Sequence, residues 1–248
     1  MGMAELELAP TLAGMAAFER ERVRYHASPP EGQAAFVVVT GRRPVVVSAP
    51  HGASHWRRNH WKQEEEYTAA MAHSLAARTG AHAIYTTYAI QPDPHADQDA
   101  GAYKAALAAL LETHPVKLVL DLHGARGSRD FAVALGTING VSCPTYENLI
   151  LDALRAHGFQ LAETAPSLDR VALNHPRYTG GVHRQTVTRF VWEVCGVEAA
   201  QLEINAWLRV VQRLEGATDY REAPRFRGDP ARILRLLDAL ASLVTALA

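Results

Sequence analysis

The stretch Lys117–Gly124, with the sequence KLVLDLHG, constrains the fold more than any other part of the chain. Its leucine and valine run, bounded by turn residues, predicts a strand that is buried on both faces. Because side chains alternate along a strand, Asp121 and His123 should point the same way at its carboxyl end. In open α/β sheets, ligands and catalytic groups collect at that end of the strands. A second apolar run, at residues 44–50, ends in His51 and Gly52. Two such strands predict a pair of imidazoles that can converge on one metal ion.

The rest of the chain alternates between segments that suit strands and segments that suit helices, which favours one three-layer α/β/α domain over residues 1–248. In this interpretation residues 1–33 are an extension that packs on the domain. The expected strands are 34–40, 45–48, 83–88, 117–124, 131–136 and 197–204, with a possible edge strand at 159–164. The first two strands are expected to flank a tight turn. The expected helices are 63–79, 103–112, 146–157, 207–214 and 231–247, whereas 53–62, 91–101 and 166–188 are expected to be loops.

Composition narrows the class of protein and of partner. A hydrophobic content of 48% and a charged content of 21% are ordinary for a soluble globular protein. The formal net charge of −1, without a long basic run, predicts no nucleic-acid or anionic-membrane partner. No segment has the ~18 uninterrupted apolar residues of a membrane span. The two cysteines are far apart and form no CxxC pair. We therefore expect a cytoplasmic protein with a small-molecule substrate, and leave its oligomeric state open.

The two histidines need a third ligand if they are to hold a catalytic metal. Two imidazoles and one carboxylate, with a fourth position left to water, form a typical catalytic zinc site. If the following helix starts near Gln63, its inward face leads back to Glu65 or Glu64. Asp121 is two residues before His123 and could orient that imidazole.

Glu203 is a carboxylate within an otherwise apolar strand, so its burial needs a reason. One reason is a role as general base beside metal-activated water. The other is a buried ion pair with Arg184 or Arg209. Both readings are open at this point.

Four motifs occur in one order along the chain: PHG at 50–52, Glu65 ahead of Thr68, DLHG at 121–124 and QLEIN at 201–205. Together they resemble the N-formylglutamate amidohydrolase family. More broadly, the pattern is similar to the fold shared by zinc carboxypeptidases and the aspartoacylase group. The resemblance implies a mixed, mostly parallel sheet between helices, one Zn²⁺ per chain and hydrolysis of an amide. It also implies that His51, Glu65 and His123 are the metal ligands and Glu203 is the base.

The chain departs from these relatives at two places. The carboxypeptidase branch has its glutamate three residues after the first histidine, where this chain has Ser54. The carboxylate must then come from residues 64–66, and spacing to Thr68 favours Glu65 over Glu64 and Glu66. The loop 93–95 has the sequence DPH where an Asp-x-Asn-Arg element is familiar. We therefore expect the substrate carboxylate to be bound by one of three other arginines: Arg126, Arg129 or Arg184.

The sequence predicts a metal-dependent amidohydrolase for a small N-acylated, N-formyl-type amino acid or a similar carboxylate-bearing molecule. A zinc peptidase for peptide or cell-wall fragments is a second reading, and it would need a more open cleft. A non-catalytic metal- or ligand-binding protein on the same scaffold is a third. A site of this composition would also accept divalent ions other than zinc.

Overall fold

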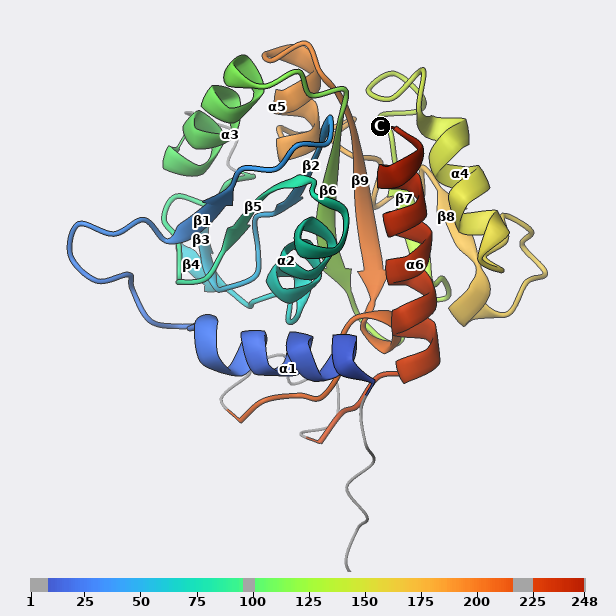
Figure 1. Cartoon of the computed structure of the whole chain (residues 1–248), viewed down its shortest axis with the longest axis horizontal. Helices are drawn as coiled ribbons and strands as arrows, with labels where there is room; N and C mark the ends of the chain where they lie inside the picture. Colours follow the sequence, from blue (N-terminus) through green and yellow to red (C-terminus); the bar gives the residue numbers. More distant parts are fainter. Residues whose placement is uncertain (1–8, 96–100, 216–224, 248) are drawn as a thin grey trace, which may run out of the picture.

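A computed structural model describes residues 9–95, 101–215 and 225–247. This part of the chain forms a seven-stranded sheet in the order β1-β5-β2-β6-β9-β7-β8, with helices on both faces (Figure 1). Its strands are β1 (Phe36–Val39), β2 (Val45–Ala49), β5 (His82–Thr86), β6 (Leu118–Ala125), β7 (Val133–Gly136), β8 (Val171–Leu173) and β9 (Glu198–Asn205). The pairs β5–β2, β2–β6, β6–β9 and β7–β8 are parallel, and β1–β5 and β9–β7 are antiparallel. The predicted three-layer architecture with a mixed, mostly parallel sheet is confirmed.

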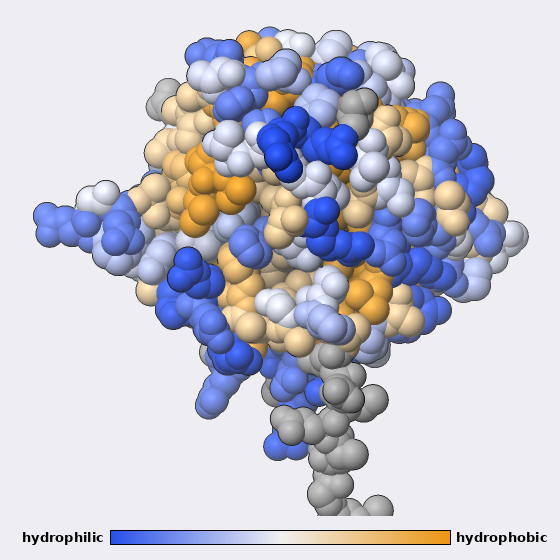
Figure 2. Space-filling view, in the orientation of Figure 1, coloured by the Kyte–Doolittle hydropathy of each residue, from blue (hydrophilic) through white to orange (hydrophobic). Residues whose placement is uncertain are grey.

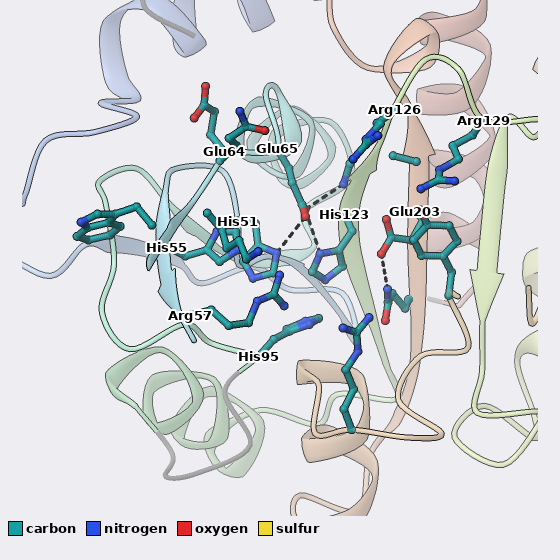
Figure 3. A pocket seen from close by; sticks show the side chains of 18 of the residues that line it. His51, His55, Arg57, Glu64, Glu65, His95, His123, Arg126, Arg129 and Glu203 are labelled. Carbon is teal, nitrogen blue, oxygen red and sulfur yellow. Dashed lines mark hydrogen bonds and ion pairs between the residues drawn. The ribbon is translucent and has the colours of Figure 1, made fainter. Parts of the chain in front are cut away.

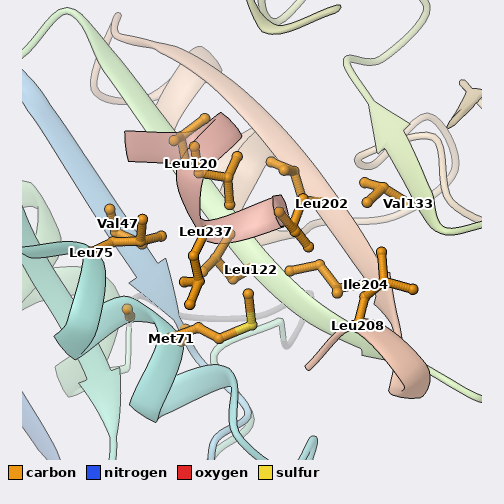
Figure 4. Packing of buried hydrophobic residues seen from close by; sticks show 14 of the residues in the cluster. Val47, Met71, Leu75, Leu120, Leu122, Val133, Leu202, Ile204, Leu208 and Leu237 are labelled. Atoms are coloured by element: carbon orange, nitrogen blue, oxygen red, sulfur yellow. The ribbon is translucent and has the colours of Figure 1, made fainter. Parts of the chain in front are cut away.

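The helices divide between the two faces of the sheet. They are α1 (Pro10–Arg22), α2 (Thr68–Thr79), α3 (Ala102–Thr113), α4 (Glu147–Ala156), α5 (Val187–Glu193) and α6 (Pro230–Ala246), with short 3₁₀ turns η1 (Ser167–Asp169) and η2 (Ala206–Leu208). One core contains residues of α1, α2, α4 and α6, and the other contains residues of α3 and α5. Alternation along the strands feeds both cores: Leu120 and Leu122 face the first, and Val119 faces the second. Figure 4 shows Leu120 and Leu122 against Leu237 in the larger core.

The central strands position the functional residues. β2, β6 and β9 are parallel neighbours, so their carboxyl ends lie at one edge of the sheet. The register pairs His123 with Glu203 across β6 and β9. The chain reaches His51 two residues after β2 ends. Three residues that are far apart in sequence therefore come to one place.

The predicted tight turn between the first two strands does not make them neighbours. β5 lies between β1 and β2, and β1 pairs with β5. The connecting segment runs across the turn between α2 and β5, where the backbone N–H groups of Arg42 and Arg43 donate to the Gly80 carbonyl. Gly41 approaches this turn so closely that a Cβ atom would lie 2.3 Å from the Gly80 oxygen. Local sequence predicted both strands, but this long-range contact decides their order.

Four other predicted boundaries were wrong. The helix expected from residue 63 starts at Thr68, because Tyr67 has a left-handed φ of 65°. Residues 53–62 form a hairpin of β3 (His55–Arg57) and β4 (His60–Lys62), turned by Arg58 and Asn59 with left-handed φ values. Segment 159–164 makes only a single bridge, at Gln160. The strand β8 lies within the expected loop 166–188, and the helix α5 begins at the end of that range, at Val187.

Two further expectations differ in extent. The helix expected at 207–214 is reduced to η2. Of the expected loop 91–101, residues 96–100 lie outside the described residues, as do residues 1–8 of the N-terminal extension. Helix α1, which belongs to that extension, packs on α2 and α6.

No helix in the described ranges combines the length and the hydrophobicity that crossing a bilayer requires. Figure 2 shows that hydrophilic residues cover much of the face seen there, with hydrophobic residues gathered in small patches.

Helix α1 contains a fully buried carboxyl group, Glu19. Its Oε1 atom accepts hydrogen bonds from the Tyr25 hydroxyl and the Tyr67 backbone N–H, each at 2.7 Å, whereas Oε2 has no hydrogen-bond partner among the described residues. Burial raises the pKa of Glu19 from 4.5 to about 7. Because the folded-state pKa lies above the unfolded value, this group stabilises the fold below pH ~4.5 and loses that contribution as the pH rises to ~7.

We expect the substitution Glu19→Gln to remove this pH dependence. Wild type should lose about 3 kcal/mol of unfolding free energy between pH 5 and pH 8 relative to the variant. Urea unfolding of both proteins at the two pH values measures the difference. Glu21→Gln, at an exposed position two residues along α1, is the matched control. Parallel pH profiles for wild type and Glu19→Gln would contradict the prediction.

Candidate metal centre

His51, Glu65 and His123 converge at the carboxyl edge of the central strands (Figure 3). The Nδ1 atom of His51 lies 3.1 Å from Glu65 Oε1, and the Nδ1 atom of His123 lies 3.0 Å from Glu65 Oε2. The three potential ligand atoms all lie within 4.8 Å of one another. Two imidazole nitrogens and one carboxylate therefore face a common point.

Backbone contacts fix Glu65 in this arrangement. Its N–H donates to the His51 carbonyl at 2.8 Å, and its carbonyl accepts a hydrogen bond from the Thr68 hydroxyl at 2.8 Å. The Gly124 N–H donates to Glu65 Oε2 at 3.0 Å. A Cβ atom at position 124 would lie 2.7 Å from the guanidinium carbon of Arg209, so any larger residue there would have to displace this buried side chain.

The other two glutamates of the cluster have different surroundings. Glu66 forms a buried ion pair with Arg213 at 2.7 Å. Glu64 approaches the Ser54 hydroxyl at 3.5 Å, and Figure 3 shows it pointing away from His51 and His123. Of the three, Glu65 is the residue that contacts both histidines. Helix phase does not select it, since all three glutamates precede α2.

Two buried aspartates hold the opposite edges of the imidazoles. His51 Nε2 lies 2.9 Å from Asp93 Oδ1, and His123 Nε2 lies 3.1 Å from Asp121 Oδ2. The hydroxyls of Ser48 and Thr188 donate to Asp121 at 2.8 and 3.2 Å. When Nε2 carries the proton and donates it to a carboxylate, the lone pair of Nδ1 is left for a metal. The contact of Asp121 was anticipated from its spacing. That of Asp93 was not, because its loop is remote in sequence.

The electrostatics of the site favour a positive charge between the three ligands. Burial acts to raise the pKa of Glu65, but His51 and His123 hold it well below the usual range. Burial acts to lower the pKa of His123, but Asp121 and Glu65 raise it well above the usual range. The pKa of His51 is raised against burial by Glu65 and Asp93. The carboxylates of Glu65, Asp93 and Asp121 thus surround the two imidazoles. A divalent cation beside the Nδ1 atoms would balance their negative charge.

Two other groups of potential ligands fit a cation less well. One combines His51 and His55 with Asp93, whose Oδ2 atom already pairs with Arg57 Nε at 3.1 Å. The other combines His95 and His123 with Asp121, and this aspartate already accepts from two hydroxyls and an imidazole. All members of both groups are buried. The group His51–Glu65–His123 has a partly exposed carboxylate that faces the cleft, so its donor set suits a catalytic metal best.

Two histidines beside the site were not identified from the sequence. The His55 ring stacks on the His51 ring with centroids 3.8 Å apart, and the His95 ring lies 4.5 Å from the His123 ring. Burial lowers the pKa of His95 to about 3 and that of His55 well below its usual value. Both are therefore neutral packing partners of the two candidate ligand imidazoles. Their sequence positions, in a hairpin and in a loop, carry no signal of this role.

Glu203 lies in β9 beside His123. Its side chain is buried, and it lines the cleft. Gln201 Nε2 donates to its Oε1 atom at 2.6 Å. Burial raises the pKa of Glu203 to about 6, even though His123 acts to lower it. Neither predicted ion pair, with Arg184 or with Arg209, occurs in the described chain. Arg209 donates instead to backbone carbonyls.

The three candidate ligands and Glu203 line one cavity of about 570 Å³. Its wall also includes the three predicted arginines: Arg126, Arg129 and Arg184. Arg129 lies over the Tyr178 ring, 5.5 Å from its centroid. The β3–β4 hairpin closes the other side with Trp61 and Lys62. Tyr103 and Lys104 are buried in α3, where Tyr103 donates to the Ile84 carbonyl.

The contact between Asp93 and His51 predicts the effect of the substitution Asp93→Asn. We expect zinc affinity to fall by about 10- to 100-fold, because the carboxylate that orients the imidazole is lost. Competition with a chelator of known affinity measures the change. Asp238→Asn, at the exposed ion pair with Arg78, is the control. Unchanged zinc affinity in Asp93→Asn would show that Asp93 does not support the ligand.

Comparisons with known proteins agree with this architecture. No protein-family model matches the chain, and no curated protein matches its sequence. Among solved structures, N-formylglutamate amidohydrolase from Ralstonia eutropha JMP134 aligns over 85% of this chain and 96% of its own, with a TM-score of 0.54 and 16% identity. The chain shares the fold of that amidohydrolase. The gene product Atu2144 from Agrobacterium tumefaciens aligns over 89% of this chain and 96% of its own, with a TM-score of 0.53 and 12% identity. At such low sequence identity, the structural alignments establish a shared fold and nothing more. This fold is the one that the sequence motifs predicted.

Proposed function

We propose that this protein is a metal-dependent amidohydrolase that cleaves the amide bond of a small N-acylated amino acid, of the N-formyl type, or of a similar carboxylate-bearing molecule. The observation that carries the proposal is the convergence of two imidazole Nδ1 atoms and the Glu65 carboxylate beside Glu203 in one cleft. The fold shared with an N-formylglutamate amidohydrolase supports the same reaction class.

His51, Glu65 and His123 would hold one zinc ion per chain. When bound, zinc supplies Lewis acidity and lowers the pKa of a coordinated water toward ~7. Asp93 and Asp121 would keep the two imidazoles in the tautomer that presents Nδ1 to the ion.

Glu203 would act as the general base and acid. Its carboxylate would take a proton from the attacking water and return it to the leaving nitrogen. The hydrogen bond from Gln201 holds the carboxylate at the cleft wall. A pKa near 6 suits both directions of proton transfer close to neutral pH.

Arginines in the same cleft would bind the substrate carboxylate. Arg126 and Arg129 follow β6 directly and line the cavity beside Glu203 (Figure 3). A guanidinium can form two parallel hydrogen bonds to a carboxylate. Such a contact would place the amide of an acylated amino acid between the metal ligands and Glu203.

Metal analysis combined with an activity screen tests this proposal. We expect about one zinc per wild-type chain and loss of the metal in each of His51→Ala, Glu65→Ala and His123→Ala. Glu64→Gln, at a neighbouring glutamate that faces away from the histidines, should keep its zinc. Zinc-loaded wild type should hydrolyse N-formylglutamate or another member of a panel of N-acylated amino acids. Absence of zinc binding after reconstitution, or absence of turnover across the panel, would overturn the proposal.

The raised pKa of Glu203 predicts the pH dependence of turnover. A general base must be deprotonated to act, so kcat/KM should fall about tenfold per pH unit below a pKa of about 6. Initial rates of the zinc-saturated enzyme between pH 4.5 and pH 8, with metal content checked at each pH, measure this limb. A kcat/KM that stays constant down to pH 5 with the metal retained would contradict the assignment.

A further inference from the structure

A second cavity, of about 320 Å³, adjoins the cleft of the candidate metal centre. We call it the side chamber. Tyr178, Arg184 and Gln201 line both cavities. Because Gln201 donates to Glu203 at 2.6 Å, the boundary between the cavities lies directly beside the proposed general base. A substrate cleaved at the metal centre could therefore extend past Gln201 into the side chamber.

The side chamber is lined by positive charge. Arg58, Arg177 and Arg184 all contribute to its wall, together with His183. None of its described lining residues is an aspartate or glutamate. Arg58, Arg177 and Arg184 are all exposed to solvent, and three cationic residues at one cavity make the local field favourable for an anionic ligand.

Three backbone carbonyls of this wall accept hydrogen bonds from the surrounding fold. The Thr179 carbonyl accepts from the Ile138 N–H at 2.7 Å, and the Gly180 carbonyl accepts from the Thr186 hydroxyl at 2.6 Å. The Gly181 carbonyl accepts from Arg189 Nη1 at 3.3 Å. These contacts tie the loop 176–181 to the surrounding fold. The backbone of this wall is therefore fixed in position, and the arginines among its lining residues are the groups that could donate to a carboxylate.

The cleft has arginines of its own, distinct from those of the side chamber, that could bind a carboxylate next to the scissile amide. Arg126 and Arg129 line the cleft but do not line the side chamber. Arg58 and Arg177 line the side chamber but do not line the cleft. The two groups of arginines therefore serve two positions along a ligand. A single acylated amino acid bound at the first position leaves the second unfilled.

We propose that the side chamber binds the carboxylate of a further acidic residue of the substrate. The preferred substrates are then acidic peptides, or N-acylated acidic peptides, of two or more residues. The inference that the side chamber binds substrate rests on the proposed amide hydrolysis. Binding of a ligand in the side chamber can nevertheless be measured without turnover.

Calorimetric titration of the zinc-loaded Glu203→Gln protein tests the binding step. The ligands are N-acetylglutamate, N-acetylglutamylglutamate and N-acetylglutamylglutamine, so that the two peptides differ by one charge. We expect the glutamylglutamate peptide to bind at least about tenfold more tightly than its glutamine counterpart, since it adds a charge-assisted contact. The double variant Arg58→Gln/Arg177→Gln should lose this gain and keep its affinity for N-acetylglutamate. Arg42→Gln, at an exposed arginine outside both cavities, should keep the gain.

Equal affinities for the two peptides, or a gain that survives the double variant, would overturn the side-chamber proposal. Kinetics of wild type then separate it from the proposed function. Hydrolysis of N-formylglutamate and N-formylglutamylglutamate with equal kcat/KM would refute the side-chamber proposal and support the amidohydrolase proposal. A gain in binding that depends on Arg58 and Arg177, without cleavage of any amide, would refute the amidohydrolase proposal and support the side-chamber proposal.

Discussion

Replacement of Glu203 by Gln should lower kcat by a factor of about 10²–10⁴ and leave the zinc content unchanged. The amide is nearly isosteric with the carboxylate, and its oxygen can still accept the hydrogen bond from Gln201 Nε2. It cannot take a proton from water at neutral pH, so the general base is lost while the cleft keeps its shape. Because Glu203 is not one of the three candidate ligands, the metal should stay bound.

Turnover and zinc content must be measured on the same protein samples. Gln201→Glu is unsuitable as a control because it would add charge beside the base, whereas Glu198→Gln, at the other end of β9, leaves the cleft intact. That control should keep wild-type turnover. A Glu203→Gln protein that retains both zinc and more than a tenth of the wild-type kcat would exclude Glu203 as the base. It would favour a protein that binds a metal or ligand without catalysis.

Replacement of Arg209 by Met should cost at least about 3 kcal/mol of unfolding free energy and should weaken zinc binding. Arg209 is 2% exposed, and its guanidinium donates to the carbonyls of Glu66, Ala125 and Ile204. These three residues follow Glu65, His123 and Glu203 by one or two positions. One side chain therefore ties together the segments that carry two candidate ligands and the proposed base. Methionine fills much of the volume but leaves the three carbonyls without this donor.

Urea unfolding of the metal-free proteins measures the loss of stability, and chelator competition measures the zinc affinity. Arg155→Met removes an arginine that is 61% exposed in α4, and it should change neither quantity by more than ~0.5 kcal/mol. A loss below about 1 kcal/mol in Arg209→Met, with wild-type zinc affinity, would show that the three segments hold their positions without the guanidinium.

The sequence was most informative where local pattern and function coincide. The apolar runs that end at His51 and His123 predicted β2, β6 and the convergence of two imidazoles, because parallel neighbours bring their carboxyl ends together. Glu203 could be singled out because a carboxylate in an apolar strand is unusual. Glu65 could be preferred within its cluster by its spacing to Thr68, although the helical geometry assumed for it was wrong.

What could not be predicted depends on contacts between distant segments. Asp93 reaches His51 from a loop 42 residues further along the chain, and no local pattern marks that pairing. His55 lies in a hairpin turned by Arg58 and Asn59, a pair that is not a strong turn signal. The insertion of β5 between β1 and β2 is likewise decided by packing of the 41–43 segment on Gly80. Hydrophobic periodicity in the sequence predicts single helices and strands, whereas these three features depend on contacts between two segments.

The strand order also sets the sequence in which a growing chain can complete its sheet. β9 lies between β6 and β7, yet it is synthesised after β7 and β8. Until residues 198–205 have emerged, β6 and the β7–β8 pair have no strand to join them, and each presents an open edge to other chains. Insertion of β9 closes both edges at once and brings Glu203 beside His123. Completion of the sheet and assembly of the candidate centre are thus one late step in the synthesis of the chain, and the facing edges of β6 and β7 stay open to other chains until that step.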